Sequence, residues 1–160
     1  MRGGLKLANV HVGELLGSSA RRRPARLVSP RSFPLSRSSL LAFYTLIGTR
    51  PRGWPGGYDG ILLASVLHNW DEETCQLLAR RAMEALEPGG WILLHEMLLG
   101  ERKDGPLPVA CFSVEMFLKH RGKQYTRSEL RALLLSSGFE DFQAEPSFGF
   151  YSLLWARKPV

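Results

Sequence analysis

The chain has 160 residues, of which 44% are hydrophobic, and its formal net charge is +6. This composition predicts one globular domain and excludes wholesale disorder. The two cysteines, Cys75 and Cys111, have no second Cys or His beside them at ligand spacing, which excludes a zinc site and a disulfide framework. No apolar run reaches the roughly 20 residues of a membrane span. We therefore expect a soluble, cytoplasmic protein without a metal.

The charge is distributed unevenly along the chain. Residues 1–53 hold ten Lys and Arg against one acid, Glu14, whereas residues 54–160 hold 11 basic and 14 acidic side chains. The positive charge therefore belongs to the N-terminal part alone. We expect no nucleic-acid or membrane partner for residues 54–160.

Residues 1–53 form an Arg-, Ser- and Pro-rich leader without lasting apolar periodicity, and we predict that this leader is disordered. Three interpretations stay open. The leader is non-homologous sequence from splicing or an inexact gene model, a transit peptide that would make the protein mitochondrial, or a basic tail that touches RNA or anionic lipid.

From Tyr58 onward the pattern predicts alternating strands and helices, and hence an α/β fold. Residues 60–67 and 91–99 read as buried parallel strands. Between them the sequence predicts a helix with Asn69 and Glu72 at capping-box spacing, an apolar stripe, and a stop at residues 88–90. The stripe comprises Cys75, Leu78, Ala79, Ala82 and Leu86.

Two more helices and a hairpin are predicted after an exposed loop at residues 100–105. Pro108 opens the first helix, and Val109, Phe112, Met116 and Phe117 form its apolar face. Thr126 and Glu129 form a capping box for the second helix, which ends at Gly138. Residues 142–145 and 150–156 fit an antiparallel hairpin. This order is the C-terminal half of a doubly wound, Rossmann-like sheet.

Several runs of residues carry a family resemblance. They are Trp54-Pro-Gly-Gly-Tyr-Asp59, Leu63-Ala-Ser-Val-Leu-His-Asn-Trp-Asp71, Leu86-Glu-Pro-Gly-Gly90, Leu94-His-Glu96, Gly122-Lys-Gln-Tyr-Thr126 and Ser137-Gly-Phe139. In order and spacing they resemble the plant-type and hydroxyindole O-methyltransferases, which use S-adenosylmethionine. The resemblance covers residues 54–160 and does not identify the hydroxyl substrate.

The resemblance implies base-assisted methyl transfer. His68 matches the family's base, and an imidazole suits the deprotonation of a phenol, whose pKa lies near 10. Glu96 matches the carboxylate that orients this base. Gln124 stands where the family commonly has a second Glu, so weaker base assistance is expected. Asn69 replaces the usual Asp.

Other residues are implied as ligand contacts. Ser65 and Trp70 match positions that bind the cofactor in the family, although Trp70 could simply anchor the start of the helix. Phe112, Glu115 and Met116 match the substrate-pocket helix, for which ordinary core packing is the alternative.

A complete enzyme of this type also needs a first strand, a glycine-rich turn and an acid for the ribose, and residues 1–53 show no such unit. We therefore expect a truncated and impaired or inactive methyltransferase whose first strand has an unpaired edge. The alternative is a non-catalytic isoform that binds a full-length relative. A homodimer also stays open.

Overall fold

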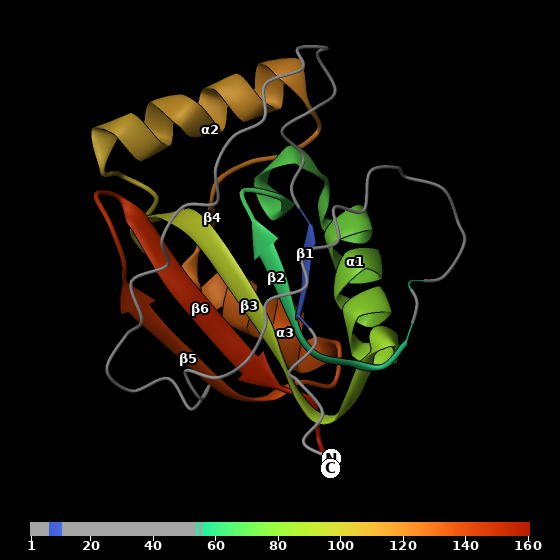
Figure 1. Cartoon of the computed structure of the whole chain (residues 1–160). Helices are drawn as coiled ribbons and strands as arrows, with labels where there is room; N and C mark the ends of the chain where they lie inside the picture. The colour runs from blue at the N-terminus through green and yellow to red at the C-terminus, as the bar shows by residue number, and fades with distance from the viewer. Residues whose placement is uncertain (1–6, 11–53, 55) are drawn as a thin grey trace, which may run out of the picture.

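The structure is a computed structural model that describes residues 7–10, 54 and 56–160. Its described strands form one open sheet in the order β1-β2-β3-β6-β5, and the short β4 pairs with β3 (Figure 1). The strands are β1 (Leu7–Val10), β2 (Tyr58–Ala64), β3 (Leu86–Leu99), β4 (Tyr125–Thr126), β5 (Glu140–Pro146) and β6 (Tyr151–Arg157). β1, β2 and β3 are parallel, whereas β6 is antiparallel to both β3 and β5.

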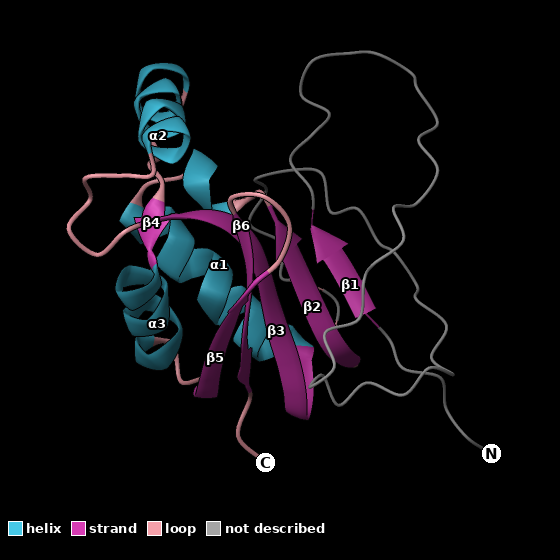
Figure 2. Ribbon diagram, turned by 90° about the vertical axis from the view of Figure 1, so that its left-hand side faces the viewer, coloured by secondary structure: helices cyan, strands magenta, loops and turns pink. Residues whose placement is uncertain are grey.

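The helices divide between one face and one end of this sheet. They are the 3-10 helix η1 (Leu67–Asn69), α1 (Glu72–Ala85), α2 (Leu107–Lys119) and α3 (Arg127–Ser136). α1 and α3 lie together on the same face, and α2 lies across the end at which β2 finishes (Figures 1 and 2). The predicted α/β fold, with its closing antiparallel hairpin, is confirmed.

The core lies between the sheet and these two helices. Ile61 and Leu63 on β2 and Ile92 and Leu94 on β3 point to this face and are at most 1% exposed. Small residues of α1 pack against them, which brings the helix close to the sheet. Full burial of each Leu or Ile contributes about 1.5–3 kcal/mol, so this layer holds the strand ends in place.

Two predicted features around α3 are confirmed. The Thr126 hydroxyl accepts the N–H of Glu129, and the Glu129 carboxylate accepts the N–H of Thr126, so that the capping box is closed in both directions. Gly138 follows the helix with a φ of 94°, a left-handed conformation that favours glycine.

The predicted start of α1 is wrong. Asp71, and not Asn69, is the N-cap, and its carboxylate accepts the N–H of Thr74. Asn69 already belongs to η1, and its side-chain amide donates to the carbonyls of Ser65 and Val66. α1 begins at Glu72, so Asp71 and not Asn69 directly precedes its first turn.

The predicted end of α1 also needs correction. The helix ends at Ala85, and β3 begins at Leu86 and includes Pro88 and the two glycines after it. Pairing with β2 is sparse there, because Leu86 lies opposite Tyr58 and regular pairing resumes only at Trp91. A proline without an N–H is tolerated where the ladder is interrupted.

The edge of β2 is not unpaired as expected. The backbone of Leu7–Val10 forms β1, which runs parallel to β2 with Leu7 opposite Gly60 and Val10 opposite Leu63. Backbone pairing needs no apolar periodicity, so four residues without a pattern can still cover an edge. The rest of the predicted disordered leader lies outside the described residues.

Side-chain exposure on α2 differs from the predicted apolar face. Val109 and Met116 are buried, whereas Phe117 is 75% exposed. The main contacts of α2 are with β3 and η1, so the stripe that it buries is narrow. Within the described part of the chain, no helix has the length and apolar character needed to cross a membrane.

Candidate active site

His68 lies at the carboxyl end of β2, on a turn set by backbone bonds. Ser65 follows the strand with a φ of 54°, and its N–H donates to the carbonyl of His95 on β3 at 3.0 Å. The chain then enters η1, which holds His68 near the strand end with an exposure of 6%. Open α/β sheets bind their ligands at this end, as expected from the sequence.

His68 and Glu96 form a buried pair. The Nδ1 of His68 lies 2.7 Å from Oε2 of Glu96, and Glu96 is 2% exposed. An ionised carboxylate can only accept hydrogen bonds, so an ionised Glu96 paired with a neutral His68 requires the proton on Nδ1 and leaves the lone pair on Nε2. The structure therefore brings together the two residues expected to act as the base and its orienting acid.

Glu96 also holds the backbone of the turn. Its second oxygen, Oε1, accepts the N–H groups of Val66 and Leu67 at 2.9 and 3.0 Å. η1 has no side-chain cap of its own, so this carboxylate from the neighbouring strand supplies the acceptor. The position of the imidazole and the path of the turn thus depend on the same side chain.

An aromatic wall from α2 adjoins the imidazole. The ring of Phe112 meets that of His68 edge to face, with 5.4 Å between the centroids and an interplanar angle of 76°. Phe112 is half-buried, and of the three predicted substrate contacts it is the one for which a His68 contact is found. Met116 is buried in the protein, and the Glu115 carboxylate forms an ion pair with Lys119 one turn along α2.

The segment from Gly122 to Thr126 crosses the turn at very close range. A Cβ on Gly122 would lie 1.9 Å from the carbonyl oxygen of His68, a distance that no side chain can adopt. Glycine is therefore required for this crossing. Sequence reasoning noted Gly122 only as part of a motif, because the partner backbone lies 54 residues away.

Gln124 lies on the same segment and is 1% exposed. Its N–H donates to the hydroxyl of Ser113 on α2 at 3.0 Å. Neither atom of its side-chain amide has a hydrogen-bond partner in the described structure. Buried polar atoms are bonded in the large majority of cases, so an unsatisfied amide on the segment that crosses the turn of His68 is exceptional.

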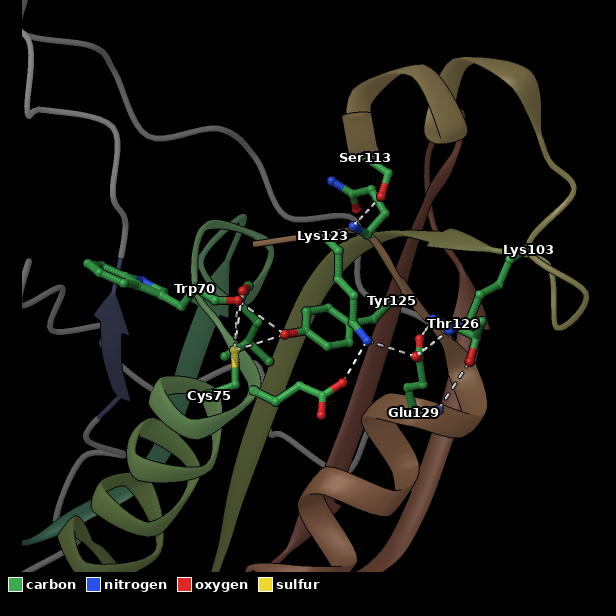
Figure 3. A network of polar contacts seen from close by, with 11 residues as sticks. Trp70, Cys75, Lys103, Ser113, Lys123, Tyr125, Thr126 and Glu129 are labelled. Carbon is green, nitrogen blue, oxygen red and sulfur yellow. Dashed lines mark hydrogen bonds and ion pairs between the residues drawn. The ribbon is translucent and has the colours of Figure 1, made fainter. Parts of the chain in front are cut away.

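Trp70 and Ser65 flank His68 on either side of the turn. The half-buried indole of Trp70 points away from Cys75 and Tyr125, while its carbonyl oxygen points toward them (Figure 3). Ser65 contributes its backbone to the turn through the bonds to His95 and Asn69. Their expected contacts with a cofactor remain predictions.

Sequence reasoning missed a polar network behind the turn. The hydroxyl of Tyr125 donates to the carbonyl of Trp70 at 3.2 Å and lies 3.3 Å from Sγ of Cys75, which also contacts the carbonyl of Leu67 (Figure 3). The sequence pattern places Cys75 only in the apolar stripe of α1. Tyr125 lies inside a quoted motif, but no periodicity relates two residues 50 positions apart.

The described part of the chain holds no group of three or more His, Cys, Asp or Glu side chains that could bind a metal ion. Cys75 and Cys111 are free thiols, the first buried and the second exposed.

An open α/β sheet with a buried imidazole and carboxylate at its carboxyl end defines a Rossmann-like enzyme domain. Residues 52–140 match the model of the O-methyltransferase domain family, which is more than half of the chain. The chain belongs to this family.

Comparison with characterised relatives agrees with this family assignment. Human acetylserotonin O-methyltransferase is 38% identical over 100 residues, which are 62% of this chain and 29% of the relative. The 3-hydroxy-5-methyl-1-naphthoate 3-O-methyltransferase of Streptomyces sahachiroi is 34% identical over 84 residues, which are 52% of this chain and 24% of the relative. The chain thus spans less than a third of the length of these relatives.

Solved structures show the same fold. Human N-acetylserotonin methyltransferase in complex with SAM superposes with a TM-score of 0.68 at 33% identity, over 75% of this chain and 34% of that chain. An O-methyltransferase family 2 protein from Planctomyces limnophilus in complex with apigenin gives a TM-score of 0.67 at 29% identity, over 74% and 35% of the two chains.

Proposed function

We propose that residues 54–160 carry the proton-transfer half of an S-adenosylmethionine-dependent O-methyltransferase site. The observation that supports this most directly is the buried contact of 2.7 Å between His68 and Glu96. Family membership supplies the reaction class, and the geometry supplies a base of the required kind.

His68 removes the proton of the acceptor hydroxyl through Nε2. A phenol is mostly neutral at pH 7, so a positioned imidazole raises the fraction of reactive oxyanion as the methyl group is transferred. The imidazolium formed in this step keeps its Nδ1 proton directed at Glu96, whose negative charge stabilises it. When bound, S-adenosylmethionine supplies an electrophilic methyl group on a sulfonium.

We propose that residues just after β2 contact this cofactor. Ser65 and Trp70 stand on either side of His68, and the indole of Trp70 is half-buried and directed away from the network behind the turn (Figure 3). A flat apolar ring suits stacking against an adenine, and we propose this role for Trp70. The complex of the human relative with SAM supports S-adenosylmethionine as the cofactor.

We propose a small aromatic hydroxyl compound, of phenol or hydroxyindole type, as the substrate. Phe112, whose ring lies edge to face with that of His68, provides an apolar surface for an aromatic ring beside the base. Gln124 would offer its unsatisfied amide as both donor and acceptor to a polar group of the bound molecule. The names of the two relatives describe substrates of this chemistry.

Two measurements test this proposal. Isothermal titration of S-adenosylmethionine into the purified chain measures cofactor binding, and transfer of a labelled methyl group to a panel of hydroxyindoles and naphthols measures activity. His68→Ala should reduce turnover by about 10²- to 10⁴-fold, the usual contribution of a general base, and leave the cofactor Kd unchanged. His120→Ala, on an exposed residue at the end of α2, is the control. Turnover unchanged in His68→Ala would exclude His68 as the base.

The alternative role as a non-catalytic partner of a full-length relative was based on an unpaired edge of β2. β1 pairs with that edge, so β1 and not β2 is the edge strand on this side of the described sheet, and the partner role stays a prediction. Homodimer formation stays a prediction, which light scattering coupled to size-exclusion chromatography would measure.

A further inference from the structure

The turn that carries His68 is bonded from behind through two of its carbonyl groups. The carbonyl of Leu67, immediately before His68, contacts Sγ of Cys75 at 3.3 Å. The carbonyl of Trp70, two residues after His68, accepts the hydroxyl of Tyr125 at 3.2 Å. The sulfur and the hydroxyl lie 3.3 Å from each other, so the two contacts form one unit (Figure 3).

Burial keeps both groups of this unit protonated. Loss of solvation raises the pKa of the Cys75 thiol to about 11, and the same cause raises the pKa of Tyr125 above its usual value. Tyr125 is 5% exposed and Cys75 is fully buried. Both therefore stay neutral hydrogen-bond donors across the pH range in which an imidazole titrates.

The segment that carries Tyr125 is itself anchored to two helices. The Nζ of Lys123 lies 2.7 Å from Glu72 on α1 and 3.0 Å from Glu129 on α3. Partial burial disfavours the charge of Lys123, but these two carboxylates outweigh it and raise its pKa. On the other side of Tyr125, the capping box of Thr126 fixes the entry into α3.

The same segment also crosses the front of the turn. Gly122 approaches the His68 carbonyl so closely that a Cβ would overlap it. The chain from Gly122 to Tyr125 therefore contacts the turn twice, once at His68 and once at Trp70. The segment is anchored to α1 and α3 and also bonded to the turn. The position of Tyr125 therefore helps to fix the position of the turn.

We propose that Tyr125 is a positioning residue for His68, which acts through the Trp70 carbonyl and Cys75 to hold the imidazole in hydrogen-bond contact with Glu96. The geometric claim stands on the contacts alone. Its consequence for catalysis rests on the proposed function.

The test compares Tyr125→Phe with Tyr151→Phe in the full chain. Tyr151 stacks on His95, on the sheet face opposite to Glu96, so its variant controls for loss of a tyrosine hydroxyl. The Nδ1 proton of His68, held by Glu96, is followed by nuclear magnetic resonance on histidine-labelled protein. Its signal should shift and exchange faster with water in Tyr125→Phe and stay unchanged in Tyr151→Phe. Urea unfolding of each variant separates this effect from global destabilisation.

Where methyl transfer is measurable, Tyr125→Phe should lower kcat about fivefold, the value of one net hydrogen bond, with little change in KM. Cys75→Ser, which keeps a donor near the Leu67 carbonyl, should retain more activity and a slower Nδ1 exchange than Cys75→Ala. If Tyr125→Phe does not fold, this cysteine pair carries the test. A wild-type Nδ1 signal in a folded Tyr125→Phe or Cys75→Ala protein would overturn the proposal. Unchanged activity in His68→Ala would instead refute the proposed function and leave the positioning result intact.

Discussion

Replacement of Glu96 by Gln tests how the carboxylate controls the imidazole. Gln is nearly isosteric with Glu, so its carbonyl oxygen can still accept the N–H groups of Val66 and Leu67 that Oε1 accepts at 2.9 and 3.0 Å. The amide NH₂ then faces Nδ1 of His68 and can only donate. We expect Nδ1 to become the acceptor and the proton to move to Nε2, so that the neutral imidazole has no lone pair for the substrate.

The magnitude follows from the two functions of this carboxylate. Loss of the correct tautomer in a base–carboxylate pair costs on the order of 10⁴-fold in kcat. Stability should change little, because Gln keeps the backbone contacts. Glu96→Ala leaves the N–H groups of Val66 and Leu67 without their acceptor, which costs roughly 1–3 kcal/mol for each buried group left unsatisfied.

The assay combines ¹⁵N chemical shifts of the His68 ring, which distinguish the tautomers, with methyl-transfer rates and urea unfolding. Glu84→Gln, at an exposed position on α1, is the matched control. A Glu96→Gln protein that keeps its proton on Nδ1 and turns over as the wild type would refute the reasoning.

Three further outcomes are expected. Gly122→Ala should destabilise the chain by at least about 2 kcal/mol in urea unfolding, because its Cβ overlaps the His68 carbonyl, while Gly56→Ala, with open space around its Cβ, should be near neutral. Burial opposes ionisation of Glu129, but Lys103, the Thr126 N–H and Lys123 outweigh it and lower its pKa to about 2. Its contribution is thus complete above about pH 4.5 and lost as the pH falls toward 2, and Glu129→Gln should flatten acid unfolding in that window. Gln124→Leu should leave thermal stability unchanged or raise it, because it removes an unsatisfied amide, yet weaken substrate binding; a large fall in Tm would show that the amide is bonded in the free protein.

The sequence predicts the order of the longer strands and helices after Tyr58 well, since each of these elements carries a local signal. Apolar runs mark β2 and β3, and the Thr126 capping box marks α3. The family resemblance implied the pairing of His68 with Glu96, and the position of both residues near the carboxyl ends of neighbouring parallel strands is consistent with it.

Other features could not be predicted because they depend on distant backbone. β1 has no pattern of its own and is defined by pairing with β2. The choice of Asp71 over Asn69 as the cap depends on η1, a single turn without sequence signal. The contact between Tyr125 and Cys75 requires α1 and α3 to share one face, which periodicity within either helix cannot specify.

Glu96 binds both the imidazole of His68 and the backbone of the turn, so it can be retained for catalysis or for structure. A relative that abandoned methyl transfer would be free to exchange the imidazole, yet its chain would still need an acceptor for the Val66 and Leu67 N–H groups. An acid retained opposite a lost histidine would therefore be the mark of a former enzyme that kept its architecture. Loss of the acid alone would damage both the proton transfer and the backbone structure of the turn.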